Sequence, residues 1–376
     1  MLHFRIACDQ FAQALARVQD FLTKTTPEYL VNVLIKSTND GSLSLSATDL
    51  DMSIQTQVKT EMLVQAGEVL LDGKKLFSLI KAIPAELLEI QVDASFDTKI
   101  TYGTHQEAHL QGLNPQDFPK IDQIDTNLAM VEVKPSIFKD LFKRTSFATG
   151  VEESRIRLTG VYLVSLEDGV FQAVATDGYR LCLVKRKIAE KTPETEMSAL
   201  IPKKGVTSIA KLMDSYDVVE IASTKSNFIL KTPDFLVSVR LINEDFPDYK
   251  AIIPKSNQIE FVYPIASLKS AMKRAISIVD ELNNAPVNLK MSGNKLHFEY
   301  KTSTSSRSIL EEIEINNPGD KEYSITFSLK YLNDILNIIE GSQIKALYGA
   351  QLNPVILVDS NHEDDTFILM ARRSNS

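Results

Sequence analysis

Pairs of side chains that could bind a metal ion occur at two places in the sequence. His105 and His109 are four residues apart, which on a helix would supply half of a zinc site. They fall instead in an apparent strand, Ile100–Leu113, where this spacing puts both on one exposed face. Asp49 and Asp51 have no third or fourth ligand nearby, so they indicate a capped turn rather than a metal site. We therefore expect no metal centre.

Catalytic motifs are also missing from the sequence. It has no G-x-S-x-G elbow, no P-loop and no G-x-G-x-x-G loop. Cys8 and Cys182 are far apart and form neither a spaced metal motif nor a disulfide framework. The N-terminus lacks a signal peptide's apolar core, and no stretch approaches the roughly 18 apolar residues of a membrane helix. We expect a cytoplasmic protein that is not an enzyme and needs no cofactor.

The elements that would position any functional residue come from an internal repeat. Ala47-Thr48-Asp49 recurs as Ala175-Thr176-Asp177, and Asp117-Phe118-Pro119 recurs as Asp245-Phe246-Pro247. Both offsets are 128 residues, and chance seldom produces two matches in the same order at one offset. The length of 376 residues then corresponds to about three such units.

Hydrophobic periodicity predicts two helices in each unit. These helices span residues 9–22, 72–83, 135–149, 203–214, 265–279 and 328–340. Alternating, β-rich runs separated by Gly or Asn turns lie between them. Each unit should therefore be an α+β domain of antiparallel sheet plus two helices. The expected domains are 1–125, 126–251 and 252–376.

The distribution of charge matters more than its total. The net charge of −8 argues, taken alone, against nucleic acid as a partner. However, the six predicted helices contain fourteen Lys or Arg and seven Asp or Glu, so they carry +7 and the rest of the chain carries −15. If these helices share one side of the assembly, that side would bind phosphates without reading sequence. Solvated helix faces are the alternative, because lysine is a good helix former.

Four local motifs carry a resemblance to a known family. They are Ala175-Thr176-Asp177-Gly178-Tyr179-Arg180-Leu181, Ile201-Pro202-Lys203-Lys204-Gly205, Asp245-Phe246-Pro247-Asp248-Tyr249 and Phe367-Ile368-Leu369-Met370-Ala371-Arg372. With the repeat and the basic helices, they make the chain resemble the beta subunit of bacterial DNA polymerase III, the sliding clamp, over essentially its whole length. The resemblance implies a head-to-tail ring of two chains, with helices lining the hole and sheets forming the rim. Such a ring holds the replicative polymerase on duplex DNA and confers processivity.

The resemblance also implies a pocket for a short peptide motif, with an apolar cleft and a polar rim. The deeper part would be formed by Leu158, Thr176, Gly178, Tyr179, Arg180, Leu181, Pro247, Ile252, Ile368 and Met370. The outer part would be formed by Arg155, Arg157, Leu352, Pro354, Ala371 and Arg372. Arg157, Ala371 and Arg372 depart from the residue types common there and make the outer part more cationic. Plain core packing is the alternative role for the apolar members.

The resemblance and the charge pattern together imply the remaining sites and the partners. The candidate DNA-binding cations are Lys24, Lys74, Lys75, Arg155, Lys203 and Lys204, followed by Lys143, Lys273 and Arg274. Leu110 and Ile278 match apolar positions where the first domain of one chain would meet the third domain of the other. The implied partners are duplex DNA, the polymerase III catalytic subunit, the clamp loader, and other polymerases and repair proteins with clamp-binding motifs. No membrane partner is expected, and the protein would act at the replisome in the nucleoid.

Two alternatives to a ring on DNA remain open at this point. A scaffold that does not encircle DNA would use the same peptide pocket, and its basic helices would simply be solvated. An enzyme with an unrecognised site would need a catalytic constellation that the motifs do not provide.

Overall fold

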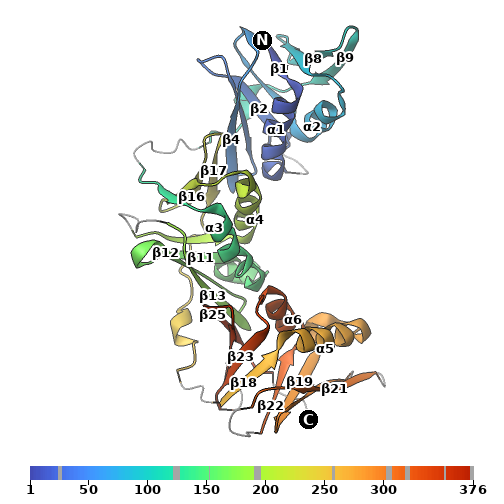
Figure 1. Cartoon of the computed structure of the whole chain (residues 1–376). Coiled ribbons are helices and arrows are strands. Elements are labelled where there is room, and N and C mark those ends of the chain that lie inside the picture. The colour runs from blue at the N-terminus through green and yellow to red at the C-terminus, as the bar shows by residue number, and fades with distance from the viewer. Residues whose placement is uncertain are drawn as a thin grey trace. The chain divides into compact units, whose positions relative to one another are not determined.

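A computed structural model describes residues 1–23, 28–121, 128–151, 153–189, 196–255, 259–301, 307–317, 322–350 and 353–372 (Figure 1). The chain forms two compact units, each with its own internal packing. The first contains Met1–Pro135, Pro193–Thr195 and Lys204–Leu241. The second contains Ser136–Thr192, Glu196–Lys203 and Ile242–Ser376.

The same order of elements occurs three times along the chain, except that the first repeat has one extra strand, Met62–Gln65. The first repeat contains β1 (Leu2–Ala7), α1 (Cys8–Val18), β2 (Asn32–Ser37), β3 (Leu43–Thr48), β4 (Met52–Val58), β5 (Met62–Gln65), β6 (Glu68–Asp72), α2 (Gly73–Ala82), β7 (Leu87–Val92), β8 (Asp97–Tyr102) and β9 (Gln106–Gln111). The second contains β10 (Val131–Val133), α3 (Pro135–Lys143), β11 (Gly160–Ser165), β12 (Val170–Thr176), β13 (Arg180–Lys187), β14 (Ser198–Pro202), α4 (Lys203–Leu212), β15 (Val219–Ser223), β16 (Asn227–Lys231) and β17 (Phe235–Arg240). The third contains β18 (Ile259–Pro264), α5 (Ile265–Ile278), β19 (Pro286–Ser292), β20 (Lys295–Lys301), β21 (Ser308–Glu314), β22 (Tyr323–Ser328), α6 (Leu329–Ile338), β23 (Gln343–Tyr348), β24 (Val355–Asp359) and β25 (His362–Leu369).

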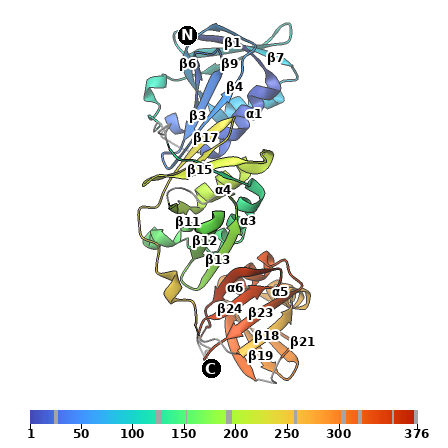
Figure 2. The same cartoon turned by 60° about the vertical axis from the view of Figure 1, so that its left-hand side comes forward.

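Strands of neighbouring repeats join into continuous antiparallel sheets. One eight-stranded sheet has the order β10-β15-β16-β17-β4-β3-β2-β6, and the other has the order β14-β11-β12-β13-β25-β24-β23-β18. We call the β4–β17 pairing the first seam and the β13–β25 pairing the second seam. Figure 2 shows β4 beside β17, and Figure 1 shows β13 beside β25. Because the second repeat gives four strands to each of these sheets, the compact units divide that repeat internally.

Two smaller sheets complete the set. Their orders are β5-β1-β7-β8-β9 and β21-β20-β19-β22. By position in the repeat, β9 corresponds to β17 and β25, while β21 corresponds to β4 and β13. In the described part of the chain, β9 and β21 are the two members of this pattern that have no seam partner.

All six predicted helices are present, with ends trimmed by a few residues. Their apolar stripes are buried, as shown by Phe11, Leu15 and Val18 of α1, which packs against α2 and the sheet strands β3 and β4. Asp72 caps α2 by accepting hydrogen bonds from the backbone N–H groups of the next turn. No helix among the described residues combines the length and apolar composition that a membrane crossing requires.

The predicted strand Ile100–Leu113 is wrong. The chain turns back at Gly103, whose φ of +65° suits glycine, so β8 and β9 form a hairpin. His105 therefore lies in the turn and His109 on β9. The alternation of side chains misled the prediction, since it continues in both arms of a hairpin.

Candidate functional site

The second seam begins at a tight turn built by Thr176 and Asp177. The Thr176 hydroxyl donates to the carbonyl of Arg180 at 2.7 Å and accepts from the N–H of Gly178 at 3.0 Å. The Asp177 carboxylate accepts from the N–H groups of Tyr179 and Arg180 at 2.9 and 3.1 Å. Gly178 has a φ of +90°, which only glycine adopts without strain. The turn therefore holds Tyr179 and Arg180 in fixed positions at the seam.

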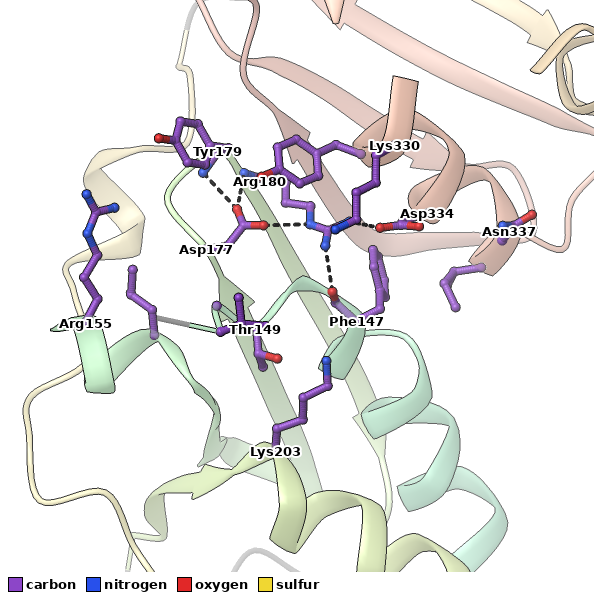
Figure 3. Close-up of a pocket in the computed structure, with 15 residues that line it drawn as sticks. Phe147, Thr149, Arg155, Asp177, Tyr179, Arg180, Lys203, Lys330, Asp334 and Asn337 are labelled. Carbon is purple, nitrogen blue, oxygen red and sulfur yellow. Dashed lines mark hydrogen bonds and ion pairs between the residues drawn. The ribbon is translucent and has the colours of Figure 1, made fainter. Parts of the chain in front are cut away.

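Arg180 is the most constrained cation of this region (Figure 3). Its guanidinium donates to Asp177 at 3.0 Å, to Asp334 of α6 at 2.6 Å and to the Phe147 carbonyl at 2.8 Å. The Tyr331 ring lies under it, 4.6 Å from the centroid. Burial, together with the charge of Asp177, raises the pKa of Tyr331. Arg180 thus ties the second repeat to the third and anchors the site more than it offers a free charge.

A cavity of about 460 Å³ opens beside this cluster. Four predicted peptide-pocket residues line it, namely Arg155, Leu158, Tyr179 and Arg180. Lys203, predicted for DNA, lines it too, together with the unpredicted Phe147, Thr149, Lys330, Tyr331 and Asp334. The walls combine aromatic rings with three cations outside the Arg180 ion pairs, so the cavity suits a partner group that is part apolar and part anionic.

Other predicted pocket residues lie on the opposite face of the same strands. Consecutive strand residues point to opposite sides of a sheet, so Leu181 faces away from Arg180. Leu181 pairs with Ile368 across the seam, and both belong to a buried apolar cluster with Val174, Leu183 and Tyr249. The structure thus divides the predicted deep pocket into a cavity and an apolar cluster, joined by the turn.

The remaining predicted pocket residues surround that cluster or lie at the end of the seam. The Pro247 carbonyl and the Ile252 N–H both hydrogen-bond to the backbone of Tyr249, at 2.7 and 3.1 Å. Met370 continues β25, and its N–H donates to the Tyr179 carbonyl at 2.9 Å. The outer positions Arg157 and Arg372 are exposed, while Pro354 and Ala371 are half-buried. Leu352 lies outside the described residues.

Four of the nine predicted DNA-binding cations are exposed and paired with carboxylates. Lys75 contacts Asp72, Lys143 contacts Glu340, Lys204 contacts Asp49 and Arg274 contacts Glu311. Lys74 is half-buried and donates to the Thr23 carbonyl at 2.9 Å. Lys273 is exposed, and Lys24 lies outside the described residues. Surface pairs of this kind are weak, so phosphates could displace them at little cost.

One arginine counted in the charge of the predicted helices does not reach the surface. Arg144, directly after α3, is only 1% exposed and lies among Asp140, Asp359 and Asp365 at 3.0 to 3.4 Å. Asp365 on β25 also binds Arg186 of β13. This buried network joins the second repeat to the third, and Arg144 cannot face DNA. The helical pattern contained a signal, since Asp140 and Arg144 are four residues apart.

The predicted dimer residues lie beside the two unmatched strands. Leu110 is half-buried on β9, and Ile278 is half-buried at the end of α5, which packs on β21. Sequence analysis missed Leu310, which is 71% exposed on β21. An exposed leucine on an edge strand is a common sign of an interface.

The two pairs considered as metal ligands in the sequence have ordinary structural roles. His109 contacts Asp97 at 3.1 Å on the neighbouring strand. Asp49 accepts hydrogen bonds from the N–H groups of Asp51 and Met52, as expected for a capped turn. Within the described ranges, no three His, Cys, Asp or Glu side chains gather as metal ligands would.

Comparison with known proteins covers nearly the whole chain. Models of the DNA polymerase III beta subunit match in three parts: the N-terminal domain over residues 2–122, the central domain over 132–248 and the C-terminal domain over 250–373. The chain is 26% identical over 383 residues to the beta sliding clamp of Halalkalibacterium halodurans, with 99% of this chain and 100% of that protein covered. The beta sliding clamp of Bacillus subtilis is also 26% identical, with the same coverage.

Solved structures give the same result. The crystal structure of the DNA polymerase III subunit beta from Pseudomonas aeruginosa is similar with a TM-score of 0.92 and 25% identity, covering 99% of this chain and 100% of that chain. The three-domain α+β fold with antiparallel sheets is therefore confirmed. The chain belongs to the family of DNA polymerase III beta subunits, the bacterial sliding clamps.

Proposed function

We propose that two copies of this chain form a closed, head-to-tail ring around duplex DNA. The observation that carries the proposal is the pattern of seams. The strand in the position of β4 pairs with the last strand of the following repeat, at β4–β17 and again at β13–β25. By the same rule β21 should pair with β9, the last strand of the first repeat, in another copy. The domains would end near Asp125 and Ala251.

The side chains at the two edges suit this pairing. Leu110 and Ile278 would cover each other on the helix-bearing face of the new nine-stranded sheet. Leu310, now exposed on β21, would meet the outer face of β9. Pairing would also satisfy the backbone N–H and C=O groups of both edges, which otherwise invite unspecific association. The number of chains, two, rests on the family resemblance.

Duplex DNA would contact the helix cations, with affinity but without sequence preference. The exposed cations Lys75, Lys203, Lys204 and Lys273, among the others predicted, supply charge that phosphates attract. The carboxylates that pair with Lys75 and Lys204 would keep these contacts weak, which allows sliding. Phosphate contacts alone carry no base specificity.

Partner proteins would bind at the second seam through a short linear motif. An apolar anchor of the motif would use the surface around Leu181, Ile368 and Met370, and its polar or acidic residues would reach Arg155 and the outer arginines. The polymerase III catalytic subunit, the clamp loader and repair proteins would all compete for this pocket. The chain would act as a processivity factor at the replisome, in the cytoplasm, with no catalytic role of its own.

Primer extension tests the proposal directly. DNA polymerase III is supplied with its clamp loader, ATP and a long singly primed circular template, with and without this protein. Full-length products after a single binding event are expected only when the protein is present. If product length does not change while the protein still binds the polymerase, it is a scaffold that does not encircle DNA.

A further inference from the structure

The turn that opens the second seam is repeated at the first seam, bond for bond. The Thr48 hydroxyl donates to the Met52 carbonyl at 2.8 Å and accepts from the N–H of Leu50 at 3.0 Å. Asp49 accepts from the N–H groups of Asp51 and Met52 at 3.1 and 2.7 Å. These partners correspond, 128 residues earlier, to the hydrogen bonds of the Thr176–Arg180 turn. The two seams therefore present the same backbone frame.

The strand pairing that follows the turn is also equivalent. The Arg240 N–H donates to the Asp51 carbonyl at 2.8 Å, as the Met370 N–H does to the Tyr179 carbonyl. Further along the first seam, Ser53 pairs with Ser238. The equivalent pair at the second seam is Leu181 with Ile368. The apolar residues of the second seam are thus replaced by serines and an arginine in the same frame.

A cleft of about 330 Å³ lies over this part of the first seam, within one compact unit. Ser53, Ser238 and Asn227 line its polar part. Pro119 belongs to its wall and corresponds in the repeat to Pro247 of the second seam. Two exposed cations, Lys120 and Arg240, line it as well, against a single carboxylate, that of Asp51. The cleft therefore suits a ligand with carboxylates and hydrogen-bonding groups.

Leu50 gives an independent sign that this seam binds something. It lines the cleft with a φ of +77°, a conformation that is costly for a branched side chain, and it is 57% exposed. The equivalent residue at the second seam is Gly178, which adopts this conformation freely. Folding gains nothing from an exposed leucine in a strained turn. A contact with a partner explains its presence.

We propose that the first seam is a second docking site, which binds an extended acidic segment of a partner protein. Carboxylates of the segment bind Lys120 and Arg240, and an apolar side chain of the segment packs on Leu50. The two seams then share a frame but select different motifs, apolar at the second and acidic at the first. The parallel with peptide binding rests on the pocket proposed at the second seam, whereas the cleft and Leu50 are observations on the first seam alone.

Fluorescence anisotropy of labelled peptides with the full-length protein tests this docking site. The first probe is a fluorescein-labelled decapeptide of alternating Asp and Leu, and its controls replace all Asp by Lys or all Leu by Ser. We expect Arg240→Gln and Leu50→Gly each to lower the affinity for the Asp-Leu peptide by about tenfold. This is the effect expected for the loss of a charged hydrogen bond or of an apolar anchor. Leu50→Gly should leave the melting temperature unchanged or raise it. A merely structural leucine would lower it.

Matched controls separate the two seams. Lys225→Gln, an exposed lysine that does not line the cleft, should change nothing. Met370→Ala should weaken the binding of a clamp-binding peptide of the polymerase, and Arg240→Gln should leave that binding unchanged. If Met370→Ala does not change the affinity of this peptide, the pocket proposed at the second seam is wrong, while the result for the first seam is unaffected.

Three outcomes would overturn the first-seam site. One is unchanged binding of the Asp-Leu peptide by both first-seam variants. Another is loss of that binding in Met370→Ala, which places the peptide at the second seam. The third is an equal loss of duplex DNA affinity in Arg240→Gln, which would assign the arginine to phosphate.

Discussion

At the scale of single residues, the second seam combines rigid charges with the partly exposed apolar side chain of Met370, which lies beside the buried Leu181 and Ile368. Arg180 satisfies its donors on Asp177, Asp334 and the Phe147 carbonyl, so it has little capacity left for a ligand. Met370 is half-buried at the end of the same seam and can contact an incoming side chain. Affinity for partner motifs should therefore depend on Met370 and Leu181 more than on Arg180.

Truncation of Met370 measures this dependence. Met370→Ala or Leu181→Ala should weaken a partner motif peptide by at least about tenfold, as removal of a central apolar anchor does. Sedimentation should show the dimer intact in both variants. The matched control is Met62→Ala, an exposed methionine on β5. Unchanged peptide affinity in both seam variants would refute the position of the pocket.

The buried network of Arg144 stabilises the second seam from beneath. Burial raises the pKa of Asp359, but hydrogen bonds from the N–H groups of Asn361 and Glu340 and from Arg144 outweigh it and hold the pKa below the ordinary value. A carboxylate with a depressed folded-state pKa stabilises the fold above its unfolded pKa, near 3.9. That stability is lost as pH falls through the folded-state pKa.

Urea unfolding at several pH values tests this contribution. Asp359→Asn should cost about 2 kcal/mol at pH 7, because it removes one of the three carboxylates around the buried Arg144 charge. The difference from the wild type should begin to shrink below about pH 4, where the carboxylate of the unfolded chain becomes protonated, and should be lost as pH falls through the lower folded-state pKa. Asp217→Asn, at an exposed position before β15, is the control and should change little. A difference that stays constant from pH 7 to pH 3 would show that Asp359 acts by packing alone.

Residue types alone predicted some of these roles and missed others. The Thr176–Leu181 motif was identified through the repeat and the resemblance, and it does form one turn and strand. Arg144 was counted with the exposed helix cations, and its spacing of four residues from Asp140 was the one local sign of an ion pair. Its partners Asp359 and Asp365 lie more than 200 residues away, so no sequence window contains them.

At the scale of elements, the helices were predictable and the seams were not. A 3.6-residue apolar period is a local signal, and each of the six predicted ranges contains or overlaps one observed helix. Pairing of β4 with β17 joins residues some 180 apart, which alternation cannot reveal. The β8–β9 hairpin was missed for a different reason. Its turn contains a single glycine, Gly103, and no strong turn sequence, so the alternation looked continuous across it.

The edge strand β9 leads to a prediction about the assembly of the ring. Leu110→Asp should convert the dimer to a monomer at micromolar concentration, since closing the ring would bury an unpaired charge beside Ile278. The monomer should stay folded, because Leu110 is only half-buried on an outer strand. Sedimentation velocity gives the state of association. Val64→Asp, at the other edge of the same sheet on β5, is the control and should remain dimeric.

At the scale of the whole molecule, the negative net charge of the chain is compatible with affinity for DNA. The predicted helices carry +7, and even with Arg144 removed from that surface they remain net positive, while the rest of the chain is acidic. The carboxylates that pair with the helix cations reduce the positive potential of the helices but do not neutralise it. A ring of such chains would attract duplex DNA on one surface and repel it elsewhere.

Retention on circular and linear DNA tests the ring most directly. The protein is loaded by its clamp loader onto nicked circular duplex, washed in high salt to remove electrostatic binding, and then exposed to a restriction enzyme that cuts the circle once. We predict that it stays on the intact circles and leaves within minutes of linearisation, because only topology holds it there. Equal loss from circular and linear DNA would contradict the account.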